Sequence, residues 1–283
     1  MSVRFITDST TDLAPEMMDR VTVLPISVRF GDKEYLDKQD ITSQQFYELL
    51  VSSDTMPTTS QVPPAAFAHA FQEAVDAGDT VVCVTISSSL SGTCQSAAIA
   101  ASQFPGKVFV VDSQTVIMGA GILLQYGLGL ADQGLSAQQI AQALEEKRSQ
   151  VKIAAVADTL EYLKKGGRIS ATVAFAGGLL NIKPILAVDD GVVGLVNKAR
   201  GGKQINTMMA KAIQNFGGID CRYPIMFGYS GLDDHLLETF MAENQQLWAD
   251  YTGPLVKVVV GAAVGTHVGP GAAAIAFFAG SQG

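Results

Sequence analysis

Apolar and polar positions follow two different spacings along the first half of the chain. Short apolar runs rich in valine and isoleucine predict buried strands at residues 3–7, 80–86 and 107–111. Segments with apolar residues every three or four positions predict helices at 15–20, 42–51, 64–77, 92–103, 116–132 and 137–150. Residues 21–30 are expected to be extended, and residues 56–64 to form a loop. Strands that alternate with helices indicate an α/β domain with a mainly parallel, doubly wound sheet.

The second half of the chain has a different pattern. Asp190 and Gly191 supply a tight turn between two apolar runs, at 184–188 and 192–198, and this predicts a β-hairpin. Further strands are expected at 153–157, 223–229 and 256–261, and helices at 159–164, 203–215, 233–249 and 270–278. This mixture predicts an α+β domain. We place the boundary near Val151, which gives an α/β domain at 1–150 and an α+β domain at 151–283.

Small hydroxyl and acidic residues follow three of the strands predicted in the first half. They lie at residues 7–10, 85–93 and 112–113. Ligands of open α/β sheets bind beyond the carboxyl ends of the strands, so these residues are candidates for a binding site. Ser91 and Gly92 stand directly before a predicted helix, whose free N–H groups favour an oxyanion. The alternative is that the serines only cap the helix.

Two further segments carry candidate polar groups. Thr59 lies in a cluster of hydroxyl residues, PTTSQ at 57–61, which is otherwise explained as a solvated turn. His267 lies in the sequence GTHVGPG, which we expect to form a constrained loop just before a helix. A single histidine is often structural, but small neighbours leave this one accessible to a ligand. Its role therefore stays open between the two.

Arg200 lies in the sequence KARGGK, after a predicted strand and before a predicted helix. A guanidinium group there can contact a phosphate or the acidic surface of a partner. The alternative is a solvated basic turn. The similar run KKGGR at 164–168 is explained mostly by the chemistry of a helix C-terminus.

Composition narrows the classes of function. Of 283 residues, 48% are hydrophobic and 16% charged, which argues for a folded protein with a large core. A net charge of -8 leaves no basic surface that indicates nucleic acid or an anionic membrane. Three cysteines without a CxxC pair predict neither a disulfide framework nor a zinc site. The chain begins directly with a predicted strand and shows no leader pattern, so we expect a cytoplasmic protein.

Several familiar motifs do not occur in the sequence. No P-loop, nucleophile elbow or cluster of metal ligands can be assembled from the spacing of residues. Residues 255–278 are apolar and long enough to span a bilayer, but glycines and Pro270 interrupt them. We therefore expect no metal site and no stable insertion into a membrane.

Taken together, the candidate segments resemble the DegV family of bacterial fatty-acid-binding proteins. The resemblance rests on seven segments, which follow the order of the family over nearly the whole chain: 5–13, 57–61, 86–93, 111–113, 163–169, 180–184 and 267–271. It implies two domains with a fatty acid between them. The carboxylate would be held by Thr59 and Ser91 with Gly92, and His267 would lie beside it.

The resemblance also implies a partner. Members of the family act as the acyl-carrying subunit of a fatty-acid kinase, whose separate ATP-binding subunit phosphorylates the bound carboxylate. Arg200 matches a position on the surface that faces the kinase. The chain itself would then supply no catalytic residue and need no cofactor beyond the bound fatty acid, and the second domain would form the pocket for the acyl chain.

Two other functions remain open. A stand-alone acyl hydrolase or transferase can be built from Ser91 as nucleophile and His267 as base. A ligand sensor or structural module without acyl transfer is the other possibility. An acyl chain contributes about 0.8 kcal/mol for each buried methylene, so the fatty-acid hypothesis requires a mostly apolar cavity that leads to hydrogen-bond donors.

Overall fold

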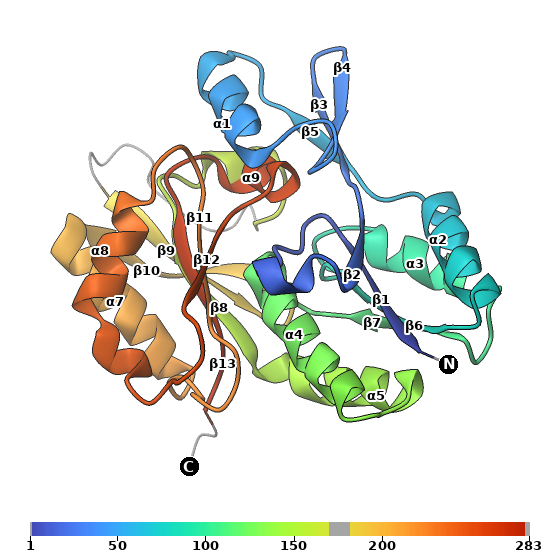
Figure 1. Ribbon diagram of the computed structural model, residues 1–283. Coiled ribbons are helices and arrows are strands. Elements are labelled where there is room, and N and C mark those ends of the chain that lie inside the picture. The colour runs from blue at the N-terminus through green and yellow to red at the C-terminus, as the bar shows by residue number, and fades with distance from the viewer. Residues whose placement is uncertain (1, 170–181, 281–283) are drawn as a thin grey trace.

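The computed structural model describes residues 2–169 and 182–280. Its first sheet is parallel throughout, and Figure 1 shows it beside a second, larger sheet. The order of strands in the first sheet is β2 (Val21–Leu24), β1 (Val3–Asp8), β6 (Thr80–Thr85) and β7 (Val108–Asp112). The carboxyl ends of these strands lie at one edge, which brings the hydroxyl-rich segments after β1 and β6 close together.

Helices cover both faces of the parallel sheet. On one face lie α2 (Pro64–Asp76) and α3 (Thr93–Ala101), and on the other lie α4 (Met118–Asp132) and α5 (Ala137–Lys147). Successive strand residues point to opposite faces, so Phe5 packs with α4 and α5 while Ile6 packs with α2 and α3. The prediction of a mainly parallel, doubly wound sheet is confirmed.

A small antiparallel sheet extends from this layer. It contains β4 (Lys33–Leu36), β3 (Ser27–Phe30) and β5 (Thr58–Ser60), and α1 (Ser43–Ser52) follows β4 along the chain. The predicted capping box of α1, between Thr42 and Gln45, is present. The predicted loop at 56–64 is wrong in part, because residues 58–60 form strand β5, in which Thr59 pairs with Val28. So short a strand depends on its distant partner and leaves no local sequence pattern.

The second sheet has six strands and is mixed. Their order is β10 (Val192–Arg200), β9 (Ile182–Asp189), β8 (Val151–Val156), β13 (Ala273–Phe278), β11 (Met226–Tyr229) and β12 (Val256–Val259). The predicted hairpin is β9 and β10. Two helices, α7 (Gly202–Asn215) and α8 (His235–Glu243), pack on one face, and the short helix α6 (Glu161–Lys165) follows β8. This is the separate mixed-sheet domain that the second half of the sequence predicts.

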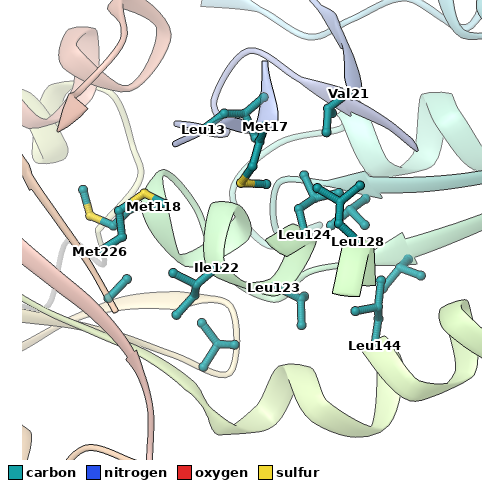
Figure 2. Close-up of a cluster of buried hydrophobic side chains, with 14 of the residues drawn as sticks. Leu13, Met17, Val21, Met118, Ile122, Leu123, Leu124, Leu128, Leu144 and Met226 are labelled. Carbon is teal, nitrogen blue, oxygen red and sulfur yellow. The ribbon is translucent and has the colours of Figure 1, made fainter. Parts of the chain in front are cut away.

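Helix α4 joins the two sheets because it is apolar on nearly all sides. Figure 2 shows Met118 beside Met226 of β11, whereas Leu124 and Leu128 point toward Met17 and Val21 of the first layer. A helix with this distribution of side chains is stable only when it is buried between two surfaces. The core therefore runs without interruption from one sheet to the other.

The predicted helix at 270–278 is wrong. Residues 273–278 form strand β13, and a seven-residue helix, α9 (Ala262–Val268), precedes it. All six residues of β13 are buried, because the sheet is covered on both faces, so the strand has no alternation of polar and apolar residues that would reveal it. Gly269 and Gly271, both with positive φ, separate α9 from β13. His267 consequently lies at the end of a helix and not before one.

Candidate functional site

A cavity of about 390 Å³ lies where the two domains meet. This volume falls in the range of cavities that hold small-molecule ligands, roughly 300–1,000 Å³. Most of the side chains that line it are apolar: Ile26, Ile86, Leu90, Val116, Leu163, Val193, Ala263, Val264 and Val268. The polar part of its wall is formed by Thr10, Thr59, Ser60, Gln61, Ser91, Arg168 and His267, together with the backbone of Gly92.

Asp8, the last residue of β1, organises the loops beneath the cavity. Its fully buried carboxylate accepts hydrogen bonds from the backbone N–H of Thr10, at 3.0 Å, and of Ile86, at 2.8 Å. Burial raises the pKa of Asp8 above its ordinary value, although these hydrogen bonds oppose the shift. The carboxylate thus holds the loops after β1 and β6 together, and both loops contribute to the cavity wall.

Thr59 and His267 meet across the domains. The hydroxyl Oγ1 of Thr59, on β5, lies 2.9 Å from Nε2 of His267, on α9. Gly166, just after α6, makes room for the imidazole, because a Cβ at this position would collide with Nδ1 of His267. The sequence predicted each residue as a candidate separately, and the structure brings them into direct contact.

The imidazole of His267 is neutral at physiological pH. Burial, with a smaller contribution from the positive charge of Arg168, lowers the pKa of His267 from 6.5 to about 4. Nδ1 is buried and has no hydrogen-bond partner among the described residues. A proton on Nε2 avoids burying an unpaired N–H at Nδ1, so we assign this tautomer. His267 then donates to Thr59, and the Thr59 hydroxyl proton is available to a ligand.

Ser91 lines the cavity and also accepts a hydrogen bond from the first backbone N–H of α3. Its Oγ accepts a hydrogen bond from the backbone N–H of Thr93, at 3.2 Å, at the first residue of α3. The hydroxyls of Ser91 and Thr93 lie 2.9 Å apart, and either can donate. If Thr93 donates, the Ser91 proton is free to point to the cavity. The two interpretations drawn from the sequence are therefore compatible.

Gly92 lies under the side chain of Gln61. A Cβ on Gly92 would collide with the amide of Gln61, so the glycine permits this close contact. The amide of Gln61 donates to Oγ of Ser96 on α3, at 2.8 Å. Gln61 was not among the candidates from the sequence, although it belongs to the same hydroxyl-rich segment as Thr59.

Arg168 is a second residue that the sequence reasoning missed. Its Nε donates to the carbonyl of Leu90, at 3.2 Å, and its Nη1 donates to the carbonyl of Gly166. These contacts fix a half-buried cation in the cavity wall, between segments from both domains. The sequence indicated only a basic helix end, because Leu90 is 78 positions away. Arg168 therefore adds a positive charge to the polar part of the cavity wall.

A surface depression of about 320 Å³ adjoins the cavity. Thr59, Arg168 and His267 line both spaces and therefore form the wall between them. The outer side adds Lys165, Gly166 and residues 56–58. A group held at the polar end of the cavity would be approached from this basic depression.

Arg200 lies away from the cavity. It is the exposed last residue of β10, whereas Val193 of the same strand lines the cavity. The two lie seven positions apart on the strand, which corresponds to roughly 23 Å at about 3.3 Å per residue. The backbone N–H of Arg200 donates to the side chain of Gln204, at 2.6 Å. Arg200 can thus face a partner but not the contents of the cavity.

Two other features of the described residues bear on function. Within 2–169 and 182–280, no group of three or more histidine, cysteine, aspartate or glutamate side chains is arranged to hold a metal ion. None of the helices in these two segments combines the length and the apolar character needed to cross a membrane.

Comparison with known proteins identifies the family. A family model described as an uncharacterised protein of the DegV family matches residues 2–280. A DegV domain-containing protein of Deinococcus radiodurans is 36% identical over 282 residues, which cover 98% of each chain. The chain belongs to the DegV family. One of the seven segments that carried the resemblance, 180–184, is described only in part. Its residues Leu180 and Asn181 lie outside the described structure, which omits 170–181.

Solved structures of proteins described as binding fatty acids share this fold. A DegV family protein of Thermus thermophilus, described as binding fatty acid, is 34% identical with a TM-score of 0.87, and the match covers 99% of this chain and 100% of that one. A stearic-acid-binding protein of Eubacterium ventriosum is 27% identical, with a TM-score of 0.85 and coverage of 99% and 98%. The fatty-acid-binding DegV of Bacillus subtilis is 27% identical, with a TM-score of 0.81 and coverage of 99% and 100%.

Proposed function

We propose that this DegV family chain binds one long-chain fatty acid in the cavity, with the carboxylate at Thr59, Ser91, Gly92 and His267. The observation that carries the proposal is the cavity itself, which is apolar over most of its wall and polar where β5, α9 and the start of α3 meet. Three relatives with the same fold are described as binding fatty acids. The domains at 1–150 and 151–283 would enclose the ligand between them.

Burial of the acyl chain supplies most of the binding free energy. Each methylene transferred from water contributes about 0.8 kcal/mol, so a long chain contributes on the order of 10 kcal/mol before the costs of association. Apolar side chains of both domains would contact the chain, including Ile86 and Val116 of the first and Val193 and Val264 of the second.

The carboxylate would be held by donors that are already oriented. His267 donates to Thr59, which leaves the Thr59 hydroxyl to donate to the ligand. Thr93 can orient Ser91 in the same way. Arg168 adds a positive charge at the same end of the cavity, and a buried anion is stable only with such partners.

We further propose that a separate ATP-binding kinase subunit phosphorylates the bound carboxylate. The sequence lacks a P-loop of its own, and the basic depression lined by Lys165 offers a path to the polar end of the cavity. Arg200 would contribute to the surface that meets the partner. Phosphate oxyanions are favoured next to Lys165 and Arg168.

The alternative of a serine-dependent hydrolase or transferase has less support. A nucleophile and its base must lie within hydrogen-bond reach of each other. The hydrogen bond of His267 Nε2 goes to Thr59, and that of the Ser91 hydroxyl goes to Thr93. A histidine with a pKa of about 4 is also a weak base at neutral pH.

Binding is tested by mass spectrometry of the intact protein under native conditions and after extraction with solvent. We expect one fatty acid per chain, and saturable uptake of added palmitate by delipidated protein. Absence of bound lipid together with no uptake of palmitate would reject the proposal.

Presentation to a kinase is tested separately, by trapping acyl phosphate with hydroxylamine. We expect hydroxamate to form only when protein, palmitate, ATP and an ATP-binding fatty-acid kinase subunit are all present. Palmitate binding without any hydroxamate would leave the lipid-binding role intact and reject the kinase partnership. Hydrolysis of acyl esters by the protein alone, abolished by Ser91→Ala, would favour the hydrolase instead.

A further inference from the structure

Asp37 caps the helix that carries His267. The Asp37 side chain lies in the segment after β4 and is 1% exposed. Its Oδ1 accepts a hydrogen bond from the backbone N–H of Ala262, at 3.0 Å, and its Oδ2 accepts one from Ala263, at 3.3 Å. These are the first two residues of α9, whose N–H groups have no partner within the helix. A carboxylate on such groups forms charge-assisted hydrogen bonds and complements the helix dipole.

The positive charge of the neighbouring Lys38 acts on the Asp37 carboxylate. Lys38 has a φ of 65°, in the left-handed region that residues with a side chain seldom adopt. This conformation directs Nζ to Oδ1 of Asp12, at 2.8 Å, and to the carbonyl of Thr11, at 2.9 Å. The buried carboxylates of Asp12 and Asp37 and the partly exposed ammonium group of Lys38 form a charge cluster, which we call the Asp37 clamp. Both aspartates hold the pKa of Lys38 above its ordinary value, whereas burial raises the pKa of Asp12 and of Asp37 and the charge of Lys38 opposes these two shifts.

Helix α9 connects the residues that contact Asp37 to the wall of the cavity. Ala263, Val264, His267 and Val268 all line the cavity, as expected for one face of a helix. Five residues of helix separate Ala262 from His267, a rise of only about 7.5 Å. At the start of this segment the Tyr47 hydroxyl donates to the carbonyl of Val260, at 3.1 Å. A shift or tilt at the first turn therefore displaces the imidazole in the last turn.

We propose that Asp37 is a positioning residue, which acts through α9 to hold His267 against Thr59 at the headgroup end of the cavity. The expected effect of Asp37 on ligand affinity rests on the proposed binding of a fatty acid. The expected effect of Asp37 on the position of His267 does not. Asp37 does not line the cavity and contacts no ligand there. Its influence on the ligand passes through the imidazole.

The test is Asp37→Asn, which keeps the shape of the side chain but removes its charge and one acceptor oxygen. The control is Asp40→Asn, because Asp40 lies in the same segment and also accepts a backbone hydrogen bond, from Leu36 at 2.8 Å, but does not touch α9. In ligand-free protein, NMR titration of the imidazole should show the pKa of His267 rising by about one unit, as a less firmly held ring gains water. Asp40→Asn should leave this pKa unchanged.

Affinity for palmitate supplies the second measurement. Asp37→Asn should weaken palmitate binding about tenfold in the otherwise unchanged protein. In a His267→Gln background, Asp37→Asn should weaken palmitate binding by less than about twofold, because the residue through which Asp37 acts is absent. An equal loss in both backgrounds would overturn the proposal, as would a fall in thermal stability with neither the His267 pKa nor the affinity altered.

A second variant serves if Asp37→Asn does not fold. Ala262→Pro removes one donor to the clamp and leaves the carboxylate, at a helix position that tolerates proline. The same two readouts apply and should move in the same directions. If the unchanged protein takes up no palmitate, the proposed function fails, and the NMR titration alone then decides whether Asp37 positions His267.

Discussion

Thr59 and His267, 208 positions apart in the sequence, are joined by a contact of 2.9 Å between Oγ1 and Nε2. The contact bridges the small antiparallel sheet and helix α9, and both residues line the cavity. The imidazole is half-buried and neutral, and its Nε2–H is oriented toward Thr59. The Thr59 hydroxyl is consequently oriented before a ligand arrives, which would lower the cost of the proposed binding of a carboxylate.

Thr59→Val should impair the binding of palmitate. The substitution keeps the shape of the side chain but removes the hydroxyl that would donate to the carboxylate, and a hydrogen bond to a charged group contributes about 1.5–3 kcal/mol. We expect the dissociation constant for palmitate to rise about tenfold, measured by fluorescence displacement or calorimetry. Thr55→Val, at an exposed position before β5, is the control and should bind as the unchanged protein does. Equal affinity of both variants would contradict the assigned role of Thr59.

Stability should depend on pH through His267. In the folded protein the pKa of His267 is lowered from 6.5 to about 4. Below pH 6.5 the unfolded chain therefore takes up a proton that the folded chain does not, and stability falls as the pH drops toward 4. Between pH 7 and pH 4.5 the loss should be about 2 kcal/mol. Urea unfolding of the unchanged protein and of His267→Gln isolates this contribution from the buried aspartates, which both proteins share. A constant difference between them over this range would show that the imidazole titrates normally.

Arg168→Gln should weaken the binding of acids but not of neutral lipids. The guanidinium group is half-buried in the cavity wall, where its charge acts on a carboxylate with little screening by solvent. We expect palmitate affinity to fall about tenfold and the affinity for hexadecanol to change by less than about twofold. The pKa of His267 should rise slightly, because Arg168 contributes to its depression. The exposed Arg29→Gln is the control, and a parallel loss of both ligands would indicate a general disturbance of the cavity.

Sequence reasoning succeeded where local pattern determines structure. The parallel sheet follows from apolar runs such as that of β6, and the β9–β10 hairpin follows from the turn at Asp190 and Gly191. It failed at β13, because a strand covered on both faces is apolar throughout and cannot be distinguished from a buried helix by periodicity.

The residues of the candidate site likewise differ in whether the sequence predicts them. Thr59, Ser91 and His267 could be proposed as separate candidates, since each lies in a segment rich in hydroxyl or glycine residues. Arg168 could not, because its place in the wall depends on a contact with Leu90 from the other domain. The contact between Asp37 and the first turn of α9 was equally hidden, since it joins residues 225 positions apart. Pairings at such separations are decided by the packing of domains, for which a single sequence carries no periodic pattern.

A larger side chain in the cavity wall should select shorter fatty acids. Ala263 lies on the face of α9 that lines the cavity, and Ala263→Leu adds three carbon atoms to that wall. The larger side chain occupies space that the acyl chain would need, so shorter acids should be retained in preference to palmitate. Mass spectrometry of extracted lipid should show acyl chains that are shorter by roughly two to four carbons. This is expected if the added side-chain carbons occupy the volume of an equal part of the acyl chain in a closely packed interior. Ala98→Leu, on the exposed side of α3, is the matched control and should leave the distribution unchanged. If Ala263→Leu alters the amount of bound lipid but not its length, the acyl chain does not run along this face of α9.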